Sequence, residues 1–279
     1  MFVTTAIKSW KPSTISKYVN CLKDFESFCD AENIDLTQTN FDYNLFLYCS
    51  FNAGRVNPRT LDSNIAGVKT LFEDLFMWKI RPTKMTDRYM KGLKASAPAK
   101  RFIASRIDQQ KLAPILKYGN DFREKSNVLA IATRLQLDLF CRVGNLVGEY
   151  PMRLSSLLND DKSLFFDKQV SLRYIVLVGS KTSLSYESRT LEIMDVTLKK
   201  DLASYFEFLK NKKNLQKSDL LFSFDQHEYN NFLNRVLSTT SHGLRSLGAR
   251  MFQSGNSQQE TMKRGGWKSY SSYKRYVVD

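Results

Sequence analysis

Hydrophobic residues recur at spacings of three and four through the first third of the chain. This period is typical of amphipathic helices, because 3.6 residues complete one helical turn. The pattern predicts four helices, over residues 14–31, 42–52, 59–76 and 85–95. We therefore expect an all-helical bundle in the first 93 residues.

The rest of the chain alternates between helical and strand patterns. Two runs rich in β-branched and aromatic residues, Leu172–Val178 and Arg189–Met194, flank a turn rich in glycine, serine and threonine and are typical of a β-hairpin. Helical spacing is found over residues 108–118, 122–147, 198–210 and 228–237. The pattern as a whole predicts a mainly α fold with a small β-sheet, in the α+β class.

The length of the chain and a change in composition predict two domains. At 279 residues the chain exceeds what one hydrophobic core usually accommodates. The segment KASAPAKRFIASR contains small residues, one proline, four basic residues and no acid. We predict a helical domain at residues 1–93, a linker at 94–106 and a second domain at 107–279.

The linker has two interpretations. Its small and polar residues suit a solvated tether, and taken alone the composition favours that interpretation. Alternatively, Lys94, Lys100, Arg101 and Arg106 lie along DNA phosphates, because the release of counterions by basic side chains supplies most non-specific affinity.

Composition narrows the choice of partner. The 42 Lys and Arg exceed the 28 Asp and Glu, and the net charge of +14 indicates a polyanion: nucleic acid first, an anionic membrane surface or acidic protein second. The four cysteines form no CxxC pair, which favours reduced thiols and argues against a structural zinc site. No stretch is apolar enough to span a bilayer, and the first ten residues do not resemble a signal peptide. We therefore expect a soluble intracellular protein.

One arginine lies among apolar residues. Arg142 stands in the sequence LFCRVGNL, where a guanidinium is costly to bury unless an anion meets it. Asp138, four residues earlier on the predicted helix, is one candidate partner. The alternative is an arginine that points from the helix end into a phosphate pocket, and the local sequence leaves both open.

The last forty residues hold the main concentration of candidate chemistry. His242 and Arg245 are three apart, and Trp267 precedes Tyr276 by nine. This stretch has too few carboxylates for two-metal phosphoryl transfer. Lys181, at the start of the predicted hairpin turn, would by itself be read as a solvated lysine.

These residue types suit a phosphoryl transfer that needs no metal. Guanidinium groups can pair with the non-bridging oxygens of a phosphate and stabilise the transition state. A tyrosine hydroxyl can then attack phosphorus to give a covalent phosphotyrosine. A lysine or histidine would protonate the departing 5′-oxygen.

In their order along the chain, these residues resemble the catalytic set of the tyrosine recombinase/integrase family. In that family an arginine follows a helix with a pattern like LFCRVGNL, a lysine lies in a β-hairpin, HxxR opens a late helix, and a histidine or tryptophan precedes the nucleophilic tyrosine by nine residues. The matching catalytic residues are Arg142, Lys181, His242, Arg245, Trp267 and Tyr276. The resemblance implies a helical core-binding domain and a mixed α/β catalytic domain that clamp DNA, with no cofactor or metal.

Several positions depart from the family pattern or stay open. Asn145 stands where the family often has a carboxylate, although its amide can still form hydrogen bonds. Trp267 replaces the commoner histidine, so it can offer one N–H to the phosphate but cannot shuttle a proton. Tyr270, Tyr273 and Tyr276 recur every three residues, and the spacing from Trp267 favours Tyr276, with Tyr273 as the alternative nucleophile.

The resemblance implies a site-specific DNA recombinase or integrase that serves a virus, plasmid or mobile element. It would act through a 3′-phosphotyrosine, as a tetramer on double-stranded recombination sites, in the cytoplasm or nucleoid of a prokaryote or the nucleus of a eukaryote. Two alternatives are a type IB topoisomerase, which shares the chemistry, and a recombinase relative that binds DNA without cleaving it. Family members commonly extend beyond the tyrosine into an arm that docks on a neighbour, whereas this sequence stops three residues after Tyr276. Either the assembly differs or the sequence is trimmed.

Overall fold

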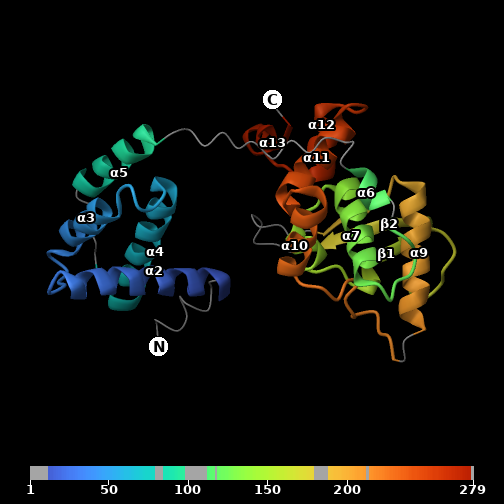
Figure 1. Ribbon diagram of the computed structural model, residues 1–279, viewed down its shortest axis with the longest axis horizontal. Coiled ribbons are helices and arrows are strands. Elements are labelled where there is room, and N and C mark those ends of the chain that lie inside the picture. The colour runs from blue at the N-terminus through green and yellow to red at the C-terminus, as the bar shows by residue number, and fades with distance from the viewer. Residues whose placement is uncertain are drawn as a thin grey trace. The chain divides into compact units, whose positions relative to one another are not determined.

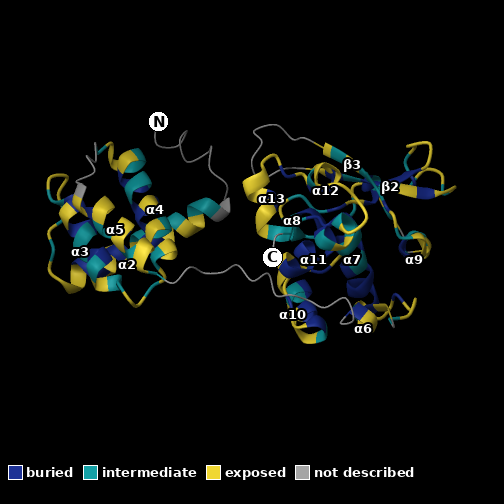
Figure 2. Ribbon diagram, turned by 90° about the horizontal axis from the view of Figure 1, so that it is seen from above, coloured by how far each residue is buried: buried dark blue, intermediate teal, exposed yellow. Residues whose placement is uncertain are grey.

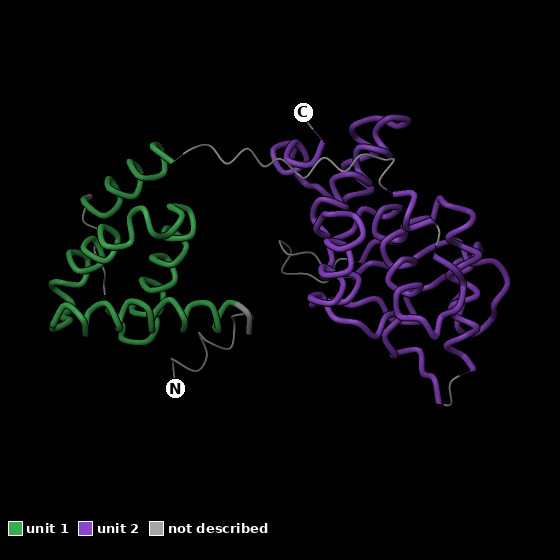
Figure 3. Tube along the Cα trace, in the orientation of Figure 1, with its two compact units in different colours: residues 1–100 green, residues 101–279 purple. Residues whose placement is uncertain are grey.

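The chain divides into two compact units, residues 1–100 and residues 101–279 (Figure 3). Each unit has its own hydrophobic core. The computed structural model describes residues 12–78, 84–97, 112–116, 118–178, 188–211 and 214–277.

Unit 1 contains the four helices that the apolar spacing predicts (Figure 1). They are α2 (Pro12–Ala31), α3 (Phe41–Asn52), α4 (Pro58–Phe76) and α5 (Lys84–Ser96). The apolar stripes of these helices meet around Phe25, which is fully buried. Its ring meets those of Phe41, Tyr48 and Phe72 edge to face, with centroids 5.8, 5.4 and 6.4 Å away. This aromatic packing holds three of the four helices together.

Unit 2 packs helices around a small sheet (Figure 1). The helices are α6 (Ala113–Leu116), α7 (Lys125–Leu139), α8 (Val143–Leu146), the 3₁₀ turn η2 (Leu154–Ser156), α9 (Val196–Lys210), α10 (Gln226–Leu237), α11 (Ser241–Gln253), α12 (Gln258–Gly265) and α13 (Tyr270–Val277). The strands are β1 (Leu157–Asn159), β2 (Leu172–Val178) and β3 (Ser188–Glu192). The mainly α fold with a small sheet, as predicted from the sequence, is confirmed.

The three strands form an antiparallel sheet in the order β1-β2-β3. Ile175 in the central strand lies opposite Leu157 on one side and Leu191 on the other. Helix α7 packs against α9, α10 and α11, and α9 packs on β2. Figure 2 shows α7 and α11 largely in the colour of buried residues.

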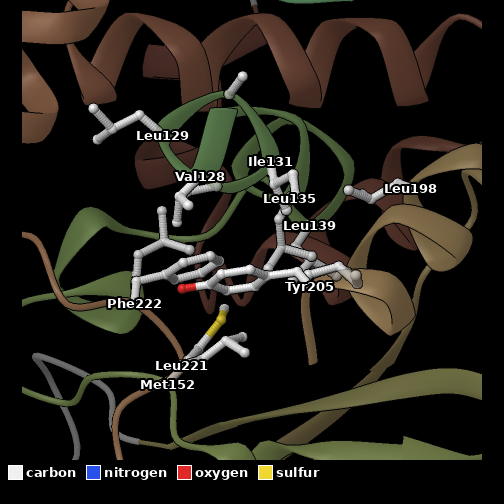
Figure 4. Close-up of a cluster of buried hydrophobic side chains, with 14 of the residues drawn as sticks. Val128, Leu129, Ile131, Leu135, Leu139, Met152, Leu198, Tyr205, Leu221 and Phe222 are labelled. Carbon is white, nitrogen blue, oxygen red and sulfur yellow. The ribbon is translucent and has the colours of Figure 1, made fainter. Parts of the chain in front are cut away.

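The main core of unit 2 lies between α7, α9 and the segments that follow α8. Figure 4 shows Leu135 and Leu139 of α7 close to Tyr205 of α9, with Met152 and Phe222 beside them. All five residues are buried. Because α7 is covered on nearly every face, its sequence is apolar around most of its circumference rather than along one stripe.

One predicted helix is wrong. The spacing predicted a single helix over residues 122–147, but α7 ends at Leu139 and Phe140 takes a left-handed backbone with φ of 30°. The apolar period continues past this break because Phe140 and Cys141 are buried by other elements, not by a continuing helix. Arg142 consequently has an extended backbone and precedes the separate short helix α8.

Three smaller boundaries also differ. Lys94, predicted to lie in the linker, belongs to the last turn of α5 and bonds Asp62 of α4 at 2.9 Å. The predicted helix at 108–118 is the short α6 within the described residues, and 108–111 and 117 lie outside them. The strand predicted to reach Met194 ends at Glu192. The Ile193 N–H still donates to the Arg173 carbonyl oxygen of β2, whereas the N–H groups of Met194 and Asp195 bond the Asp138 side chain. Within the described residues, no helix has both the length and the apolar character needed to cross a bilayer.

The crossing of α11 over α7 depends on Gly248. A Cβ atom at this position would lie 2.3 Å from the Leu137 carbonyl oxygen, and backbone atoms cannot yield as side chains do. We expect Gly248→Ala to lower the free energy of unfolding by about 1–3 kcal/mol. Urea unfolding followed by circular dichroism measures this. Gly255→Ala is the matched control, since a Cβ there meets nothing within 4 Å, and equal midpoints for the two variants would contradict the close approach.

Candidate active site

A cleft of about 700 Å³ lies in unit 2 and gathers residues that are far apart in the sequence. Five of the six predicted catalytic residues line it: Arg142, His242, Arg245, Trp267 and Tyr276. The sixth, Lys181, lies outside the described residues, as do Lys100, Arg101 and Arg106 of the predicted linker.

Arg245 is the most deeply buried of the charged side chains that line the cleft. Its side chain is 2% exposed, and its Nη2 donates to the Gly265 carbonyl oxygen at 2.9 Å. The guanidinium carbon lies 4.8 Å from the centre of the Trp267 ring and 5.2 Å from that of Tyr276. Burial lowers the pKa of Arg245 to about 10, which still leaves it charged at neutral pH. Among the described residues no carboxylate pairs with it, and its Nε has no hydrogen-bond acceptor.

Arg142 faces the same cleft from the start of α8. Of the two interpretations of this arginine, pairing with Asp138 is wrong. The Asp138 carboxylate instead accepts from Arg264 at 3.1 Å and from the backbone N–H groups of Met194 and Asp195. The break in α7 at Phe140 separates Arg142 from the face on which Asp138 lies. No carboxylate among the described residues forms an ion pair with Arg142.

His242 lies in the first turn of α11. The helix begins there because the Thr240 hydroxyl oxygen accepts the Gly243 N–H. The imidazole lies 4.8 Å from the Tyr276 ring, centre to centre. Partial desolvation lowers the pKa of His242, and the positive charges of Arg245 and Arg142 lower it further. The imidazole is therefore neutral at pH 7, with a nitrogen able to accept a proton.

Trp267 covers Arg245 because two glycines fold the chain back after α12. Gly266 ends the helix with φ of 67°, a left-handed conformation that glycine adopts without strain. A Cβ at Gly265 would lie 1.9 Å from the indole, so only glycine leaves room for it. The indole stacks on Phe140 at 5.8 Å and is 7% exposed. Its Nε1 is buried without a hydrogen-bond acceptor among the described residues.

The three C-terminal tyrosines have different environments. Tyr276 lines the cleft, whereas Tyr273 is 1% exposed and packs edge-on against Trp267. Tyr270 is 50% exposed and does not line the cleft. The Ser246 hydroxyl of α11 donates to the Tyr276 carbonyl oxygen at 2.5 Å. This bond fixes α13 on α11, so that Tyr276 and Arg245 of one chain meet.

Asn145 donates a hydrogen bond that an ionised carboxylate at this position could not donate. Its Nδ2 donates to the Val178 carbonyl oxygen at 3.0 Å, and an ionised Asp or Glu cannot donate. Val178 is the last residue of β2, and the segment with Lys181 begins immediately after it. The asparagine therefore ties the helix that follows Arg142 to the end of the strand that leads to Lys181.

Sequence reasoning missed the polar contacts that hold the turn between α12 and Trp267. Arg264 donates to the carboxylate and carbonyl oxygens of Asp138 and to the Glu192 carbonyl oxygen. Arg189 donates to the Arg264 carbonyl oxygen at 2.9 Å. The only signal in the sequence is the basic pair that precedes GGW, and its acceptors are distant in the chain. Among the described residues, no group of three His, Cys, Asp or Glu side chains is placed to hold a metal ion.

The sequence matches no protein-family model and no curated protein, but the fold matches solved structures. A lambda integrase fragment (75–356), solved as a dimer on a COC′ core site, superposes with a TM-score of 0.66 at 15% identity. The match covers 99% of this chain and 92% of that one. The protein has the tyrosine recombinase fold.

Two further structures with this fold match over nearly the whole chain. The Tn1549 transposon integrase, solved with transposon right end DNA, gives a TM-score of 0.61 at 11% identity and covers 100% of this chain and 94% of its own. XerH recombinase, solved on its difH substrate before cleavage, gives 0.64 at 11% identity and covers 95% and 76%. At identities this low, the comparison establishes the fold alone. The chemistry of the site follows from the side chains that line the cleft.

His242 provides a probe of the charges in the cleft. We expect its imidazole to titrate below the ordinary value of 6.5, and Arg142→Met to raise its pKa toward 6.5 by removing a neighbouring positive charge. Between the folded pKa and 6.5 the unfolded chain binds more protons, so this group makes the free energy of unfolding rise with pH across that window. NMR titration measures the pKa, and His227, the other of the two histidines, provides the reference signal. A wild-type pKa at or above 6.5 would show that the cleft is not assembled as described.

Proposed function

We propose that this protein is a site-specific DNA recombinase that cleaves and rejoins strands through a 3′-phosphotyrosine on Tyr276. One observation carries the proposal: two guanidinium groups, Arg142 and Arg245, face the cleft of Tyr276 without a carboxylate partner among the described residues. A buried guanidinium such as that of Arg245 needs an anion, all the more with the second cation of Arg142 facing the same cleft, and a phosphodiester supplies one.

The N–H donors and the positive charge of the cleft suit the non-bridging oxygens of a phosphodiester. Arg142 and Arg245 supply guanidinium N–H groups and positive charge, and the Trp267 Nε1–H is a third donor. Preorganised donors of this kind stabilise the pentacoordinate phosphate of the transition state more than the phosphodiester of the ground state. Each donor contributes ~3 kcal/mol. The stacking of Trp267 on Phe140 keeps its N–H from rotating away.

Strand cleavage proceeds by attack of the Tyr276 hydroxyl oxygen on phosphorus. The O–P bond to tyrosine forms as the bond from phosphorus to the 5′-oxygen breaks. The hydroxyl proton passes to the neutral imidazole of His242, whose ring adjoins that of Tyr276. Lys181, by its place in the predicted hairpin, donates a proton to the 5′-oxygen. Religation is the same step in reverse, with the 5′-hydroxyl of a partner strand as nucleophile.

The proposed partners are double-stranded recombination sites and further copies of the chain. The net charge of +14 favours DNA. Lambda integrase, which shares the fold, has also been solved as a tetramer on a Holliday junction, with a TM-score of 0.61. By analogy we propose that four copies of the chain assemble on two DNA duplexes. We also propose that the protein recombines the DNA of a virus, plasmid or transposon.

The choice of nucleophile is tested with a suicide substrate nicked near the cleavage site. The wild-type protein is expected to form a covalent protein–DNA adduct, Tyr276→Phe to form none, and Tyr273→Phe to retain it, because Tyr273 packs outside the cleft. Denaturing gel electrophoresis measures the adduct. DNA binding without any wild-type adduct would identify a non-catalytic relative, and relaxation of supercoils without exchange between two sites would identify a topoisomerase.

The bond between Ser246 and the Tyr276 carbonyl predicts that each chain cleaves with its own tyrosine. Tyr276→Phe and Arg142→Ala should both lack adduct formation while still binding DNA, and a mixture of the two should stay inactive. In a mixture that cleaves in trans, the Tyr276 of one variant would reach the intact cleft of the other. Adduct above the level of the separate variants would therefore contradict cleavage in cis.

A further inference from the structure

Gln136 lies beneath the cleft and is completely enclosed, with 0% of its side chain exposed. It belongs to α7, one turn before the helix ends. Its Nε2 donates to two backbone carbonyl oxygens, that of Cys141 at 3.1 Å and that of Ser241 at 3.2 Å. Its Oε1 accepts the hydroxyl of Tyr229 in α10 at 2.9 Å.

These three partners fix the orientation of the amide. Carbonyl oxygens only accept hydrogen bonds, so the NH₂ end must face Cys141 and Ser241. The Tyr229 hydroxyl then donates to the oxygen end, and a rotated amide would place Oε1 against both carbonyls. Because Tyr229 is also fully buried, no water competes for these groups.

The two carbonyl groups belong to the residues immediately before Arg142 and His242. One nitrogen atom therefore holds two segments that are separated by about a hundred residues of sequence. The first segment is irregular, since α7 has ended at the left-handed Phe140 and α8 has not begun. The second is the first turn of α11, whose Ser241 N–H is also held by the side chain of Asn230.

We propose that Gln136 is the positioning residue that sets the spacing between Arg142 and His242 in the cleft. Arg142 has an extended backbone and forms no ion pair with a carboxylate among the described residues, and the Gln136 amide joins the residue before it directly to the start of α11. The catalytic consequence rests on the proposed function, whereas the spacing itself does not. A displacement of about 1 Å in a catalytic group can cost on the order of 100-fold in rate.

Gln136→Met tests the clamp because methionine fills a similar volume without either donor. Thr133→Val is the matched control. Thr133 lies one turn earlier on α7 and is equally buried. Its hydroxyl donates to the Leu129 carbonyl of its own helix and also meets the Tyr229 hydroxyl, but it holds neither the Cys141 nor the Ser241 carbonyl. Both variants lose a buried hydrogen bond of the core, but only Gln136→Met frees the Cys141 and Ser241 carbonyls. Thermal unfolding shows how far each variant is destabilised.

The first measurement is the NMR titration of His242 in the full chain, and it needs no activity. Among the described residues, the charged groups that line the cleft with this imidazole are Arg142, Arg245, Arg275 and Glu149. Release of the clamp lets Arg142 move away, so the pKa of His242 is expected to rise toward 6.5 in Gln136→Met and to stay at the wild-type value in Thr133→Val. An unchanged pKa in Gln136→Met would overturn the proposal, even if the wild-type protein cleaves no DNA.

The second measurement is the single-turnover rate of adduct formation with saturating protein on the suicide substrate. Gln136→Met is expected to bind the substrate normally and to form adduct about 10- to 100-fold more slowly. Thr133→Val is expected to keep the wild-type rate. Equal rates in the two variants would make Gln136 a core residue only. Absence of wild-type adduct would refute the proposed function and leave the titration to decide the clamp.

Discussion

The buried contact between Asp138 and Arg264 is the junction on which the cleft depends. Arg264 joins the end of α7 to the end of β3 through the Asp138 carboxylate at 3.1 Å and the Glu192 carbonyl oxygen at 2.8 Å. Burial raises the pKa of Asp138, while Arg264 and two backbone N–H groups act against that rise. Removal of either partner would leave a buried charge uncompensated, typically at a cost of about 3–5 kcal/mol. Trp267, which lines the cleft, comes three residues after Arg264, and Phe140, on which its indole stacks, comes two residues after Asp138.

Around this junction, uncharged side chains hold the backbone beside the site residues. Gln136 bonds the carbonyls that precede Arg142 and His242, Asn145 bonds the end of β2, and Ser246 bonds the carbonyl of Tyr276. In each case an amide or hydroxyl donates to a carbonyl oxygen. The arrangement fixes the backbone without carboxylates, which would compete with a phosphate for the guanidinium groups.

The same arrangement leaves the cleft energetically incomplete. Arg245 is buried beside aromatic rings with an unsatisfied Nε, and the Trp267 indole N–H is likewise unsatisfied among the described residues. Unpaired donors and like charges in a low-dielectric site cost stability. Under the proposed function, a phosphodiester in the cleft would supply the negative charge that Arg245 lacks and so offset part of this cost. Functional sites commonly keep groups that lower the stability of the folded chain because those groups bind or react with the substrate.

Features that depend on local spacing could be predicted from the amino-acid pattern. The helical and strand periods predicted α2 to α5 and the β-hairpin, and the order of motifs placed five site residues in what the structure shows to be one cleft.

The partners of the charged residues and the break after α7 depend on contacts between distant parts of the chain. The spacing of apolar residues does not reveal the end of α7 at Phe140. Phe140 and Cys141 are buried by distant elements, so the apolar pattern continues although the helix has ended. The pairing of Asp138 with Arg264 rather than Arg142 joins residues 126 apart, and no local rule selects among such partners. The separation of Tyr276 in the cleft from Tyr273 in the core likewise followed from how α13 packs on α11 and Trp267. Spacing fixes which residues share a helix or strand, whereas long-range packing fixes what each of them meets.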